Sequence, residues 1–171
     1  MDLIQSRIRD IPDFPHAGIM FKDLTPLLRD PAALAATVEA LVAPFRDDDI
    51  SVVLGMEARG FVFGALAARE LGAGFVPLRK PGKLPAATYS ESYELEYGTA
   101  TLHMHQDAVV ADDRVLLVDD LVATGGTAAA SLALARRSGA TVVGCAFVVE
   151  LDFLRGRAAL GDCRVHSLVH Y

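Results

Sequence analysis

Two adjacent carboxylates, Asp119 and Asp120, end an apolar run in the segment VLLVDDLVATGGTA (115–128). A loop of small and hydroxyl-bearing residues follows them: Ala123, Thr124, Gly125, Gly126 and Thr127. Backbone N–H groups at the start of the helix predicted next attract a phosphate, and the two glycines let the backbone approach it. Adjacent carboxylates can accept hydrogen bonds from a vicinal diol and favour a nearby cation. The segment therefore predicts a site for a ribose 5-phosphate unit.

Other interpretations of this loop are weaker. No lysine follows the glycines as in a Walker loop, and the spacing is not G-x-G-x-x-G, so the pattern favours a simple phosphate ester over a nucleoside triphosphate. The acids could merely end a strand and the glycines merely form a turn. The full order of strand, paired acids, small loop and helix favours the phosphate site.

The elements that must position this loop alternate along the chain. Apolar periodicity and turn residues predict helices over 29–45, 60–72 and 126–140, the first capped by Asp30. Continuous apolar runs predict strands over 51–55, 74–80, 114–120 and 141–151. We therefore predict an α/β fold with a mostly parallel central sheet flanked by helices.

Composition narrows the class of protein. The chain has 171 residues, which suits a single domain over 1–171, and a formal net charge of −6 at pH 7. That charge argues against binding to nucleic acid or to an anionic membrane surface. The first ten residues mix acids and bases instead of forming the apolar stretch of a signal peptide, so we expect a cytoplasmic protein. Cys145 and Cys163 lack metal-ligand spacing and are expected to be buried free thiols.

A long polar segment over 80–105 interrupts the alternation. Its second half, YELEYGTATLHMH, alternates like a hairpin with Gly98 at the turn. Such a segment inside a compact domain is often an active-site lid, and the alternative is a solvated surface hairpin.

The segment 115–128 resembles the phosphoribosyl pyrophosphate motif of the type I phosphoribosyltransferases, in the version of those that act on adenine. Four more segments resemble that family in the right order: DIPDFPHAGIMFKDLTPLL (10–28), GMEARGFVFG (55–64), LRKPGKLPAATYSESYELEYG (78–98) and VVELDFLRGR (148–157). Ala58, where many relatives have serine, is a small departure, as are Met20 and Lys22.

The resemblance implies a type I phosphoribosyltransferase fold with an N-terminal, purine-side hood (1–30) and a flexible catalytic lid (80–105). It implies that adenine and phosphoribosyl pyrophosphate give AMP and pyrophosphate, with Mg²⁺ held mainly through the substrate and not by direct protein ligands. It also implies a homodimer. The alternatives are transfer to xanthine or another purine, and a non-catalytic sensor of phosphoribosyl pyrophosphate.

The resemblance also assigns residues. Glu57, Ala58 and Arg59 form the pyrophosphate loop, with a cis peptide at Glu57–Ala58, and Arg59 stabilises the leaving group. Further positive charge comes from Arg79, which can reach the partner's site, and from Lys80 and Lys83. Glu96 is expected to be the general acid/base, with Tyr97 helping to position it. Adenine is expected to contact four residues: Met20 and Lys22 through their backbones, Phe21 by stacking on one face, and Leu151 on the other.

Overall fold

A five-stranded parallel sheet forms the centre of the protein in the computed structural model, which describes residues 2–94 and 98–171. The strand order is β4–β3–β7–β8–β9, and every neighbouring pair is parallel. The strands are β3 (Val52–Met56), β4 (Gly74–Leu78), β7 (Arg114–Val122), β8 (Thr141–Glu150) and β9 (Val165–His170). The predicted α/β class and parallel sheet are confirmed, whereas β9 was not predicted because its run VHSLVH is short and partly polar.

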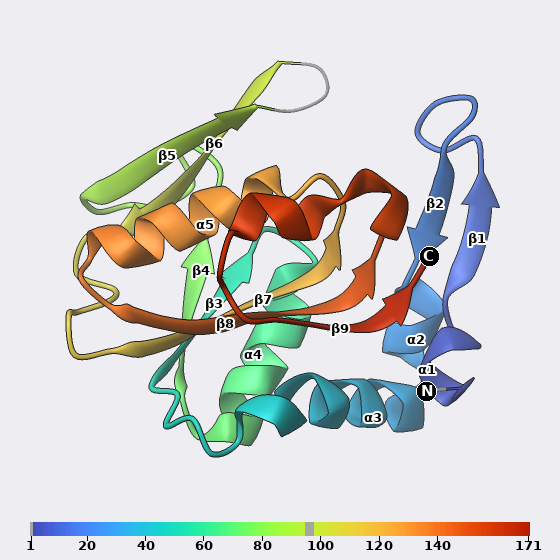
Figure 1. Cartoon of the computed structure of the whole chain (residues 1–171), viewed down its shortest axis with the longest axis horizontal. Helices are drawn as coiled ribbons and strands as arrows, with labels where there is room; N and C mark the ends of the chain where they lie inside the picture. Colours follow the sequence, from blue (N-terminus) through green and yellow to red (C-terminus); the bar gives the residue numbers. More distant parts are fainter. Residues whose placement is uncertain (1, 95–97) are drawn as a thin grey trace.

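Helices cover both faces of this sheet (Figure 1). Helices α3 (Pro31–Val42) and α4 (Gly60–Leu71) lie on one face, and α5 (Gly126–Arg137) lies on the other. The α3 helix begins where the Asp30 carboxylate accepts hydrogen bonds from the backbone N–H groups of Ala32 and Ala33, which confirms the predicted cap. The α4 helix ends at Gly72, whose positive φ of 68° suits glycine.

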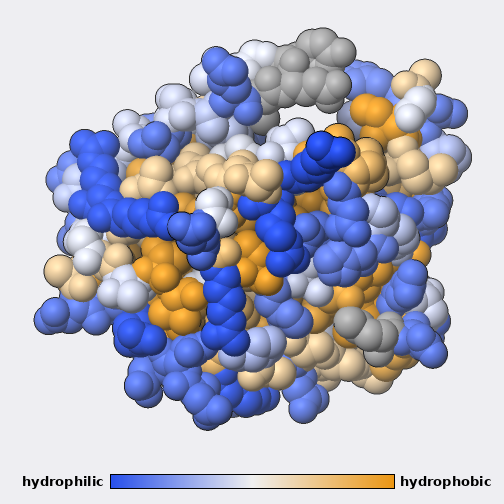
Figure 2. All heavy atoms as spheres, viewed as in Figure 1, coloured by the Kyte–Doolittle hydropathy of each residue, from blue (hydrophilic) through white to orange (hydrophobic). Residues whose placement is uncertain are grey.

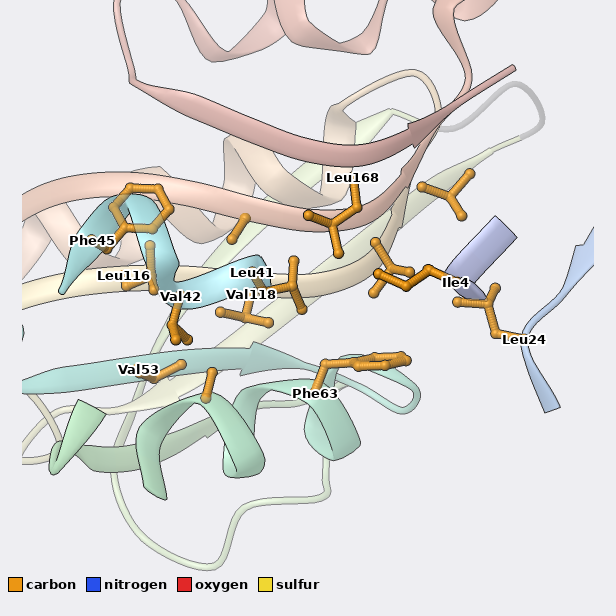
Figure 3. Packing of buried hydrophobic residues seen from close by; sticks show 14 of the residues in the cluster. Ile4, Leu24, Leu41, Val42, Phe45, Val53, Phe63, Leu116, Val118 and Leu168 are labelled. Carbon is orange, nitrogen blue, oxygen red and sulfur yellow. The ribbon is translucent and has the colours of Figure 1, made fainter. Parts of the chain in front are cut away.

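The core consists of two apolar layers, one on each face of the sheet. In β3, Val53 packs with residues of α3 and α4, such as Leu41 and Phe63 (Figure 3), while its neighbours Val52 and Leu54 pack on the α5 side. Successive side chains of a strand point to opposite faces, so continuous apolar strands are needed between two helix layers. Packing between the two helix layers therefore fixes the position of the polar residues at the carboxyl ends of the strands.

Two antiparallel hairpins project from this body. Near the N-terminus, β1 (Arg9–Pro12) pairs with β2 (Met20–Asp23), beside α1 (Asp2–Gln5) and α2 (Thr25–Arg29). The second hairpin, β5 (Thr88–Glu94) with β6 (Thr99–His105), packs against α5. The hairpin predicted in the polar segment is confirmed, but its first strand begins earlier than the alternation suggested.

The remaining helical segments are short 3₁₀ turns: η1 (Ala43–Phe45), η2 (Asp152–Leu154) and η3 (Gly156–Leu160). No helix among the described residues is long and apolar enough to cross a membrane. Hydrophilic side chains cover most of the face in Figure 2, with apolar ones in smaller areas between them. Cys163 is only partly buried, so the expectation that both thiols are buried was wrong for this residue.

Candidate active site

A cavity of about 520 Å³ lies at the carboxyl ends of β3 and β7, the edge where parallel α/β sheets bind ligands. Three predicted groups that are distant in sequence meet in it: the loop at 57–59, the paired acids and Thr127. The lining residues are Glu57, Ala58, Arg59, Lys80, Tyr93, Ala100, Leu102, Asp119, Asp120, Leu121 and Thr127. The hairpin β5–β6 supplies one wall through Tyr93, Ala100 and Leu102.

A smaller cavity of about 90 Å³ lies over the loop that precedes α5. All five loop residues predicted from the sequence line it: Ala123, Thr124, Gly125, Gly126 and Thr127. Among the described residues no side chain caps α5, so the backbone N–H groups of its first turn remain available to a ligand. Gly125 has φ of +84°, and a Cβ there would overlap the carbonyl oxygen of Gly156. The loop therefore has the shape and the polarity of a pocket for one phosphate group.

The paired acids lie at the floor of the larger cavity. Asp119 is partly buried and Asp120 is 4% exposed. Burial raises the pKa of Asp119 well above its ordinary value, and the negative charge of Asp120 raises it further. Burial also raises the pKa of Asp120, although the Arg59 guanidinium opposes this shift. Two carboxylates so placed favour a ligand that brings hydroxyl donors or positive charge.

Arg59 bridges the acids and the N-terminal hairpin. Its Nε lies 2.6 Å from Oδ2 of Asp120, so the two side chains form an ion pair. This oxygen is buried, and no described residue donates a well-directed hydrogen bond to it. The guanidinium carbon also lies 5.2 Å from the ring centroid of Phe21. The next residue is Gly60, where a Cβ would stand 2.5 Å from Oδ1 of Asp119. Glycine is therefore required for α4 to begin this close to the acids.

The loop over 57–59 has the predicted geometry, because the Glu57–Ala58 peptide is cis. Glu57 Oε2 accepts hydrogen bonds from Arg79 Nε at 3.1 Å and from the backbone N–H of Lys80 at 3.0 Å. Burial raises the pKa of Glu57, but these donors outweigh it and the net shift is downward. Arg79 also donates to the carbonyl of Lys83. Arg79 and Lys80 of the predicted basic cluster thus contact this loop, with Arg79 turned toward Glu57 of its own chain.

The predicted adenine residues lie on the hood and after β8. Phe21 packs edge-to-face against Phe14 at 5.0 Å between centroids, and Met20 is 49% exposed. Lys22 is buried, and its Nζ lies 2.7 Å from Asp10 Oδ1. Leu151 is partly buried in the core layer on the α3 and α4 side. Only Phe21 of these four residues has an observed contact with the loop over 57–59, through Arg59.

Tyr93 is a candidate functional residue that sequence reasoning missed. Thr127 Oγ1 donates a hydrogen bond to the Tyr93 hydroxyl at 3.2 Å. A Cβ on Gly126 would stand 3.1 Å from the Tyr93 ring, so the ring lies directly over the phosphate loop. Tyr93 is one of three tyrosines in the segment 80–105, so the sequence alone did not distinguish it from the others. The predicted acid/base Glu96 and its neighbour Tyr97 lie outside the described residues.

These features are those of a type I phosphoribosyltransferase. A parallel α/β sheet carries a cavity that joins paired acids, an arginine loop and a helix start suited to a phosphate. The family model of the phosphoribosyl transferase domain matches residues 25–160. The adenine phosphoribosyltransferase of Methylococcus capsulatus is 63% identical over 171 residues, covering 100% of both chains. The chain therefore belongs to the adenine phosphoribosyltransferase family of pentosyltransferases, as the motifs predicted.

Solved structures agree with this assignment. The adenine phosphoribosyltransferase of Rhodothermus marinus is 50% identical with a TM-score of 0.95, covering 99% of this chain and 97% of its own. The enzyme of Saccharomyces cerevisiae is 38% identical with a TM-score of 0.92, covering 98% of each chain. That structure was solved with D-2,5-dideoxy-2,5-imino-altritol 1,6-bisphosphate and adenine. The predicted type I fold is confirmed.

Proposed function

We propose that the protein serves purine salvage by transferring the 5-phosphoribosyl group of phosphoribosyl pyrophosphate to N9 of adenine, giving AMP and pyrophosphate. One observation carries the proposal: a single cavity joins the Arg59 loop, the paired acids and Thr127 of the phosphate loop. These are the groups that a pyrophosphate, a ribose and a 5-phosphate each require. Adenine bound with the bisphosphate in the yeast relative agrees with this ligand set.

The paired acids bind the ribose in this proposal. Asp119 and Asp120 accept hydrogen bonds from the 2- and 3-hydroxyls, while the backbone N–H groups around Gly125 and Gly126 hold the 5-phosphate. Binding of the diol lowers the two raised carboxyl pKa values, because hydroxyl donors stabilise the charged form of each carboxylate. It also frees Arg59 from Asp120, so that the guanidinium can face the departing pyrophosphate.

Mg²⁺ fits this arrangement. Two acids with raised pKa values, one of which is buried beside Arg59, favour positive charge near them, and magnesium prefers oxygen ligands. We expect substrate oxygens to hold most of the ion, with no direct protein ligand. When bound, Mg²⁺ neutralises charge that develops on the leaving pyrophosphate. Glu57 positions Arg79 and the backbone of Lys80 on the same side, and Lys83 adds positive charge.

The hood binds the purine. Phe21 stacks on one face and Leu151 lies against the other, but stacking accepts any purine. Selection comes from the backbone: the carbonyl of Met20 accepts from the 6-amino group, and the N–H of Lys22 donates to N7. The Lys22 side chain is already engaged by Asp10, which supports a backbone role for this residue. A 6-carbonyl base would face Met20 with two unpaired acceptors, costing about 1–3 kcal/mol.

The lid completes the site. Residues 80–105 close over the reactants and exclude water, which would otherwise attack the activated sugar. Glu96 manages the proton of the imidazole ring of adenine as N9 attacks. Tyr93 supports this closure because its hydroxyl already contacts Thr127 of the phosphate loop.

A panel of free bases tests the proposal. Purified protein receives phosphoribosyl pyrophosphate, Mg²⁺ and adenine, hypoxanthine, guanine or xanthine, and released pyrophosphate is measured. Equimolar mixtures then show which nucleotide forms. We expect AMP to predominate. Predominant XMP, IMP or GMP would assign another purine, and no pyrophosphate with any base would favour a sensor.

The protein is proposed to act as a cytoplasmic homodimer. The α4 helix supports a subunit interface because it exposes Val62 (40% exposed), beside a surface hollow of about 690 Å³ that Leu34, Val38 and Leu66 help to line. Leu34 packs against the core but is only partly buried, so part of its apolar surface is left for an interface. Arg79 follows β4, and its guanidinium carbon lies 5.9 Å from the centroid of the Phe61 ring of α4. We expect Arg79 to reach the partner's site from this position.

A further inference from the structure

The two cysteines of the chain, Cys145 and Cys163, lie side by side although 18 residues separate them. Their Sγ atoms are 3.6 Å apart. Cys145 is in β8, and its backbone N–H donates to the carbonyl of Arg164 at 2.8 Å, so adjacent main chains hold the two residues together. A disulfide requires the sulfur atoms to approach by about 1.5 Å, to the usual S–S length. Rotation of the partly exposed Cys163 side chain can supply this movement.

The two thiols differ in surroundings. Cys145 is 0% exposed, whereas Cys163 is partly exposed in the turn between η3 and β9. The hydrogen bond with Cys145 lowers the pKa of Cys163 to about 7, helped by the positive charge of Arg136 on α5, while burial opposes the shift. The same hydrogen bond and burial raise the pKa of Cys145. Cys163 is therefore the more accessible and more acidic thiol of the pair, and Cys145 is its buried partner.

We propose that Cys163 is an oxidation site for hydroperoxides and that Cys145 resolves the oxidised form as an internal disulfide. The Cys163 thiolate attacks one oxygen of hydrogen peroxide, the O–O bond breaks, and the departing hydroxide takes a proton to become water. Cys163 is then a sulfenic acid. The Cys145 sulfur attacks it, the S–O bond breaks, and the hydroxyl leaves with the Cys145 proton as a second water. A dithiol reductant returns both thiols.

The pair lies outside the active-site cavity, since neither cysteine lines it. Arg136, which lowers the Cys163 pKa, also lines a surface hollow of about 390 Å³ with Leu160, Gly161 and Asp162, next to Cys163 in sequence. The hollow gives a small peroxide an approach from solvent to this corner of the protein. The reaction thus requires none of the residues that line the active-site cavity.

Intact-mass measurement tests the proposal on the unmodified protein. After treatment with hydrogen peroxide and denaturation in N-ethylmaleimide, we expect each chain to lose two hydrogens and to carry no maleimide. Dithiothreitol should restore two maleimide adducts per chain. Two persistent thiols per chain, or disulfides only between chains on a non-reducing gel, would overturn the proposal.

Variants assign the two roles. In Cys145→Ala, peroxide should leave a sulfenic acid on Cys163 that a cyclic 1,3-dione traps, whereas Cys163→Ala should trap none. The pH midpoint of Cys163 alkylation should be about 7 in the unmodified protein and higher in Cys145→Ala, because that variant loses the main stabilising hydrogen bond. Equal trapping in both variants would refute the assignment of Cys163 as the nucleophile.

Discussion

Asp119 and Asp120, the proposed ribose ligands, lower the stability of the folded protein when they are charged. Burial raises the pKa of both carboxyl groups, so the folded protein holds its protons more tightly than the unfolded chain does. The contribution of such a group to the unfolding free energy falls as the pH rises from 3.8, the ordinary pKa of an aspartate, through the raised pKa of the folded state. The destabilisation is fully present above the folded pKa.

Asp119→Asn tests this cost. The variant keeps the shape and loses the charge, so we expect Tm at pH 7 to rise by about 2 °C or more, the shift that ~1 kcal/mol gives in a domain of this size. The advantage over the unmodified protein should shrink as the pH falls toward 3.8. Activity should fall by orders of magnitude, because a carboxylate acceptor for the ribose is lost. Asp112→Asn, at an exposed site, is the control, and an equal Tm rise there would contradict the argument.

Tyr93→Phe isolates a single hydroxyl. The ring over Gly126 remains, but the hydrogen bond from Thr127 is lost. A net hydrogen bond is worth about 0.5–1.5 kcal/mol, so KM for phosphoribosyl pyrophosphate should rise about 2- to 10-fold with little change in kcat. Tyr89→Phe is the matched control, because Tyr89 is in the same strand and its ring packs under Arg137. Unchanged KM in Tyr93→Phe would limit Tyr93 to packing.

Glu96→Gln tests the proposed acid/base role. If Glu96 manages a proton, kcat should fall by about 10²- to 10⁴-fold, while adenine affinity changes far less. Steady-state kinetics with an adenine titration by calorimetry separate the two effects. An unchanged kcat and pH profile, with chemistry rate-limiting, would reassign Glu96 to closing the lid.

At the scale of elements, the phosphate loop depends on the segment behind it. A Cβ on Gly156, at the start of η3, would overlap the carbonyl oxygen of Ala123, and a Cβ on Gly125 would overlap the carbonyl of Gly156. The backbone of the loop and the backbone at the start of η3 are therefore in direct contact, which requires glycine at both 125 and 156. The position of the loop is set by η3 as much as by α5, although η3 lines neither active-site cavity.

Gly156→Ala should displace this loop without touching the substrate. Misplacement by about 1 Å can cost up to 10²-fold, so we expect kcat/KM for phosphoribosyl pyrophosphate to fall by about 10- to 100-fold. Gly74→Ala in β4 is the control, because its Cβ would be 3.6 Å from the nearest atom, an ordinary contact. Circular dichroism checks that both variants fold. Normal kinetics in a folded Gly156→Ala would show that the loop position does not depend on η3.

At the scale of the whole molecule, the exposed face of α4 is the proposed subunit interface. A charge at Val62 would be buried without a partner, so Val62→Glu should shift the protein from dimer to monomer in sedimentation velocity. Val110→Glu is the control, since Val110 is 58% exposed and lies in the connection between β6 and β7, outside α4. A dimer that persists in Val62→Glu would place the interface elsewhere.

The sequence by itself determined the parts of the site that are continuous along the chain. Asp119, Asp120 and the loop through Thr127 follow one another, so the order of strand, acids, loop and helix is visible in composition and spacing. The helices and most central strands were predicted for the same reason, because helical periodicity and continuous apolar runs are local properties. The family resemblance rested on such continuous segments.

The tertiary structure alone decided which of these parts touch. Tyr93 meets Thr127 across 34 residues, Arg59 meets Asp120, Gly156 backs the phosphate loop, and Cys145 meets Cys163. Each contact depends on the order and register of strands and on which face a hairpin covers. An apolar run indicates that a strand is covered on its faces, but it does not identify the residues that cover them. Those partners are chosen only when the five strands pack between their two helix layers.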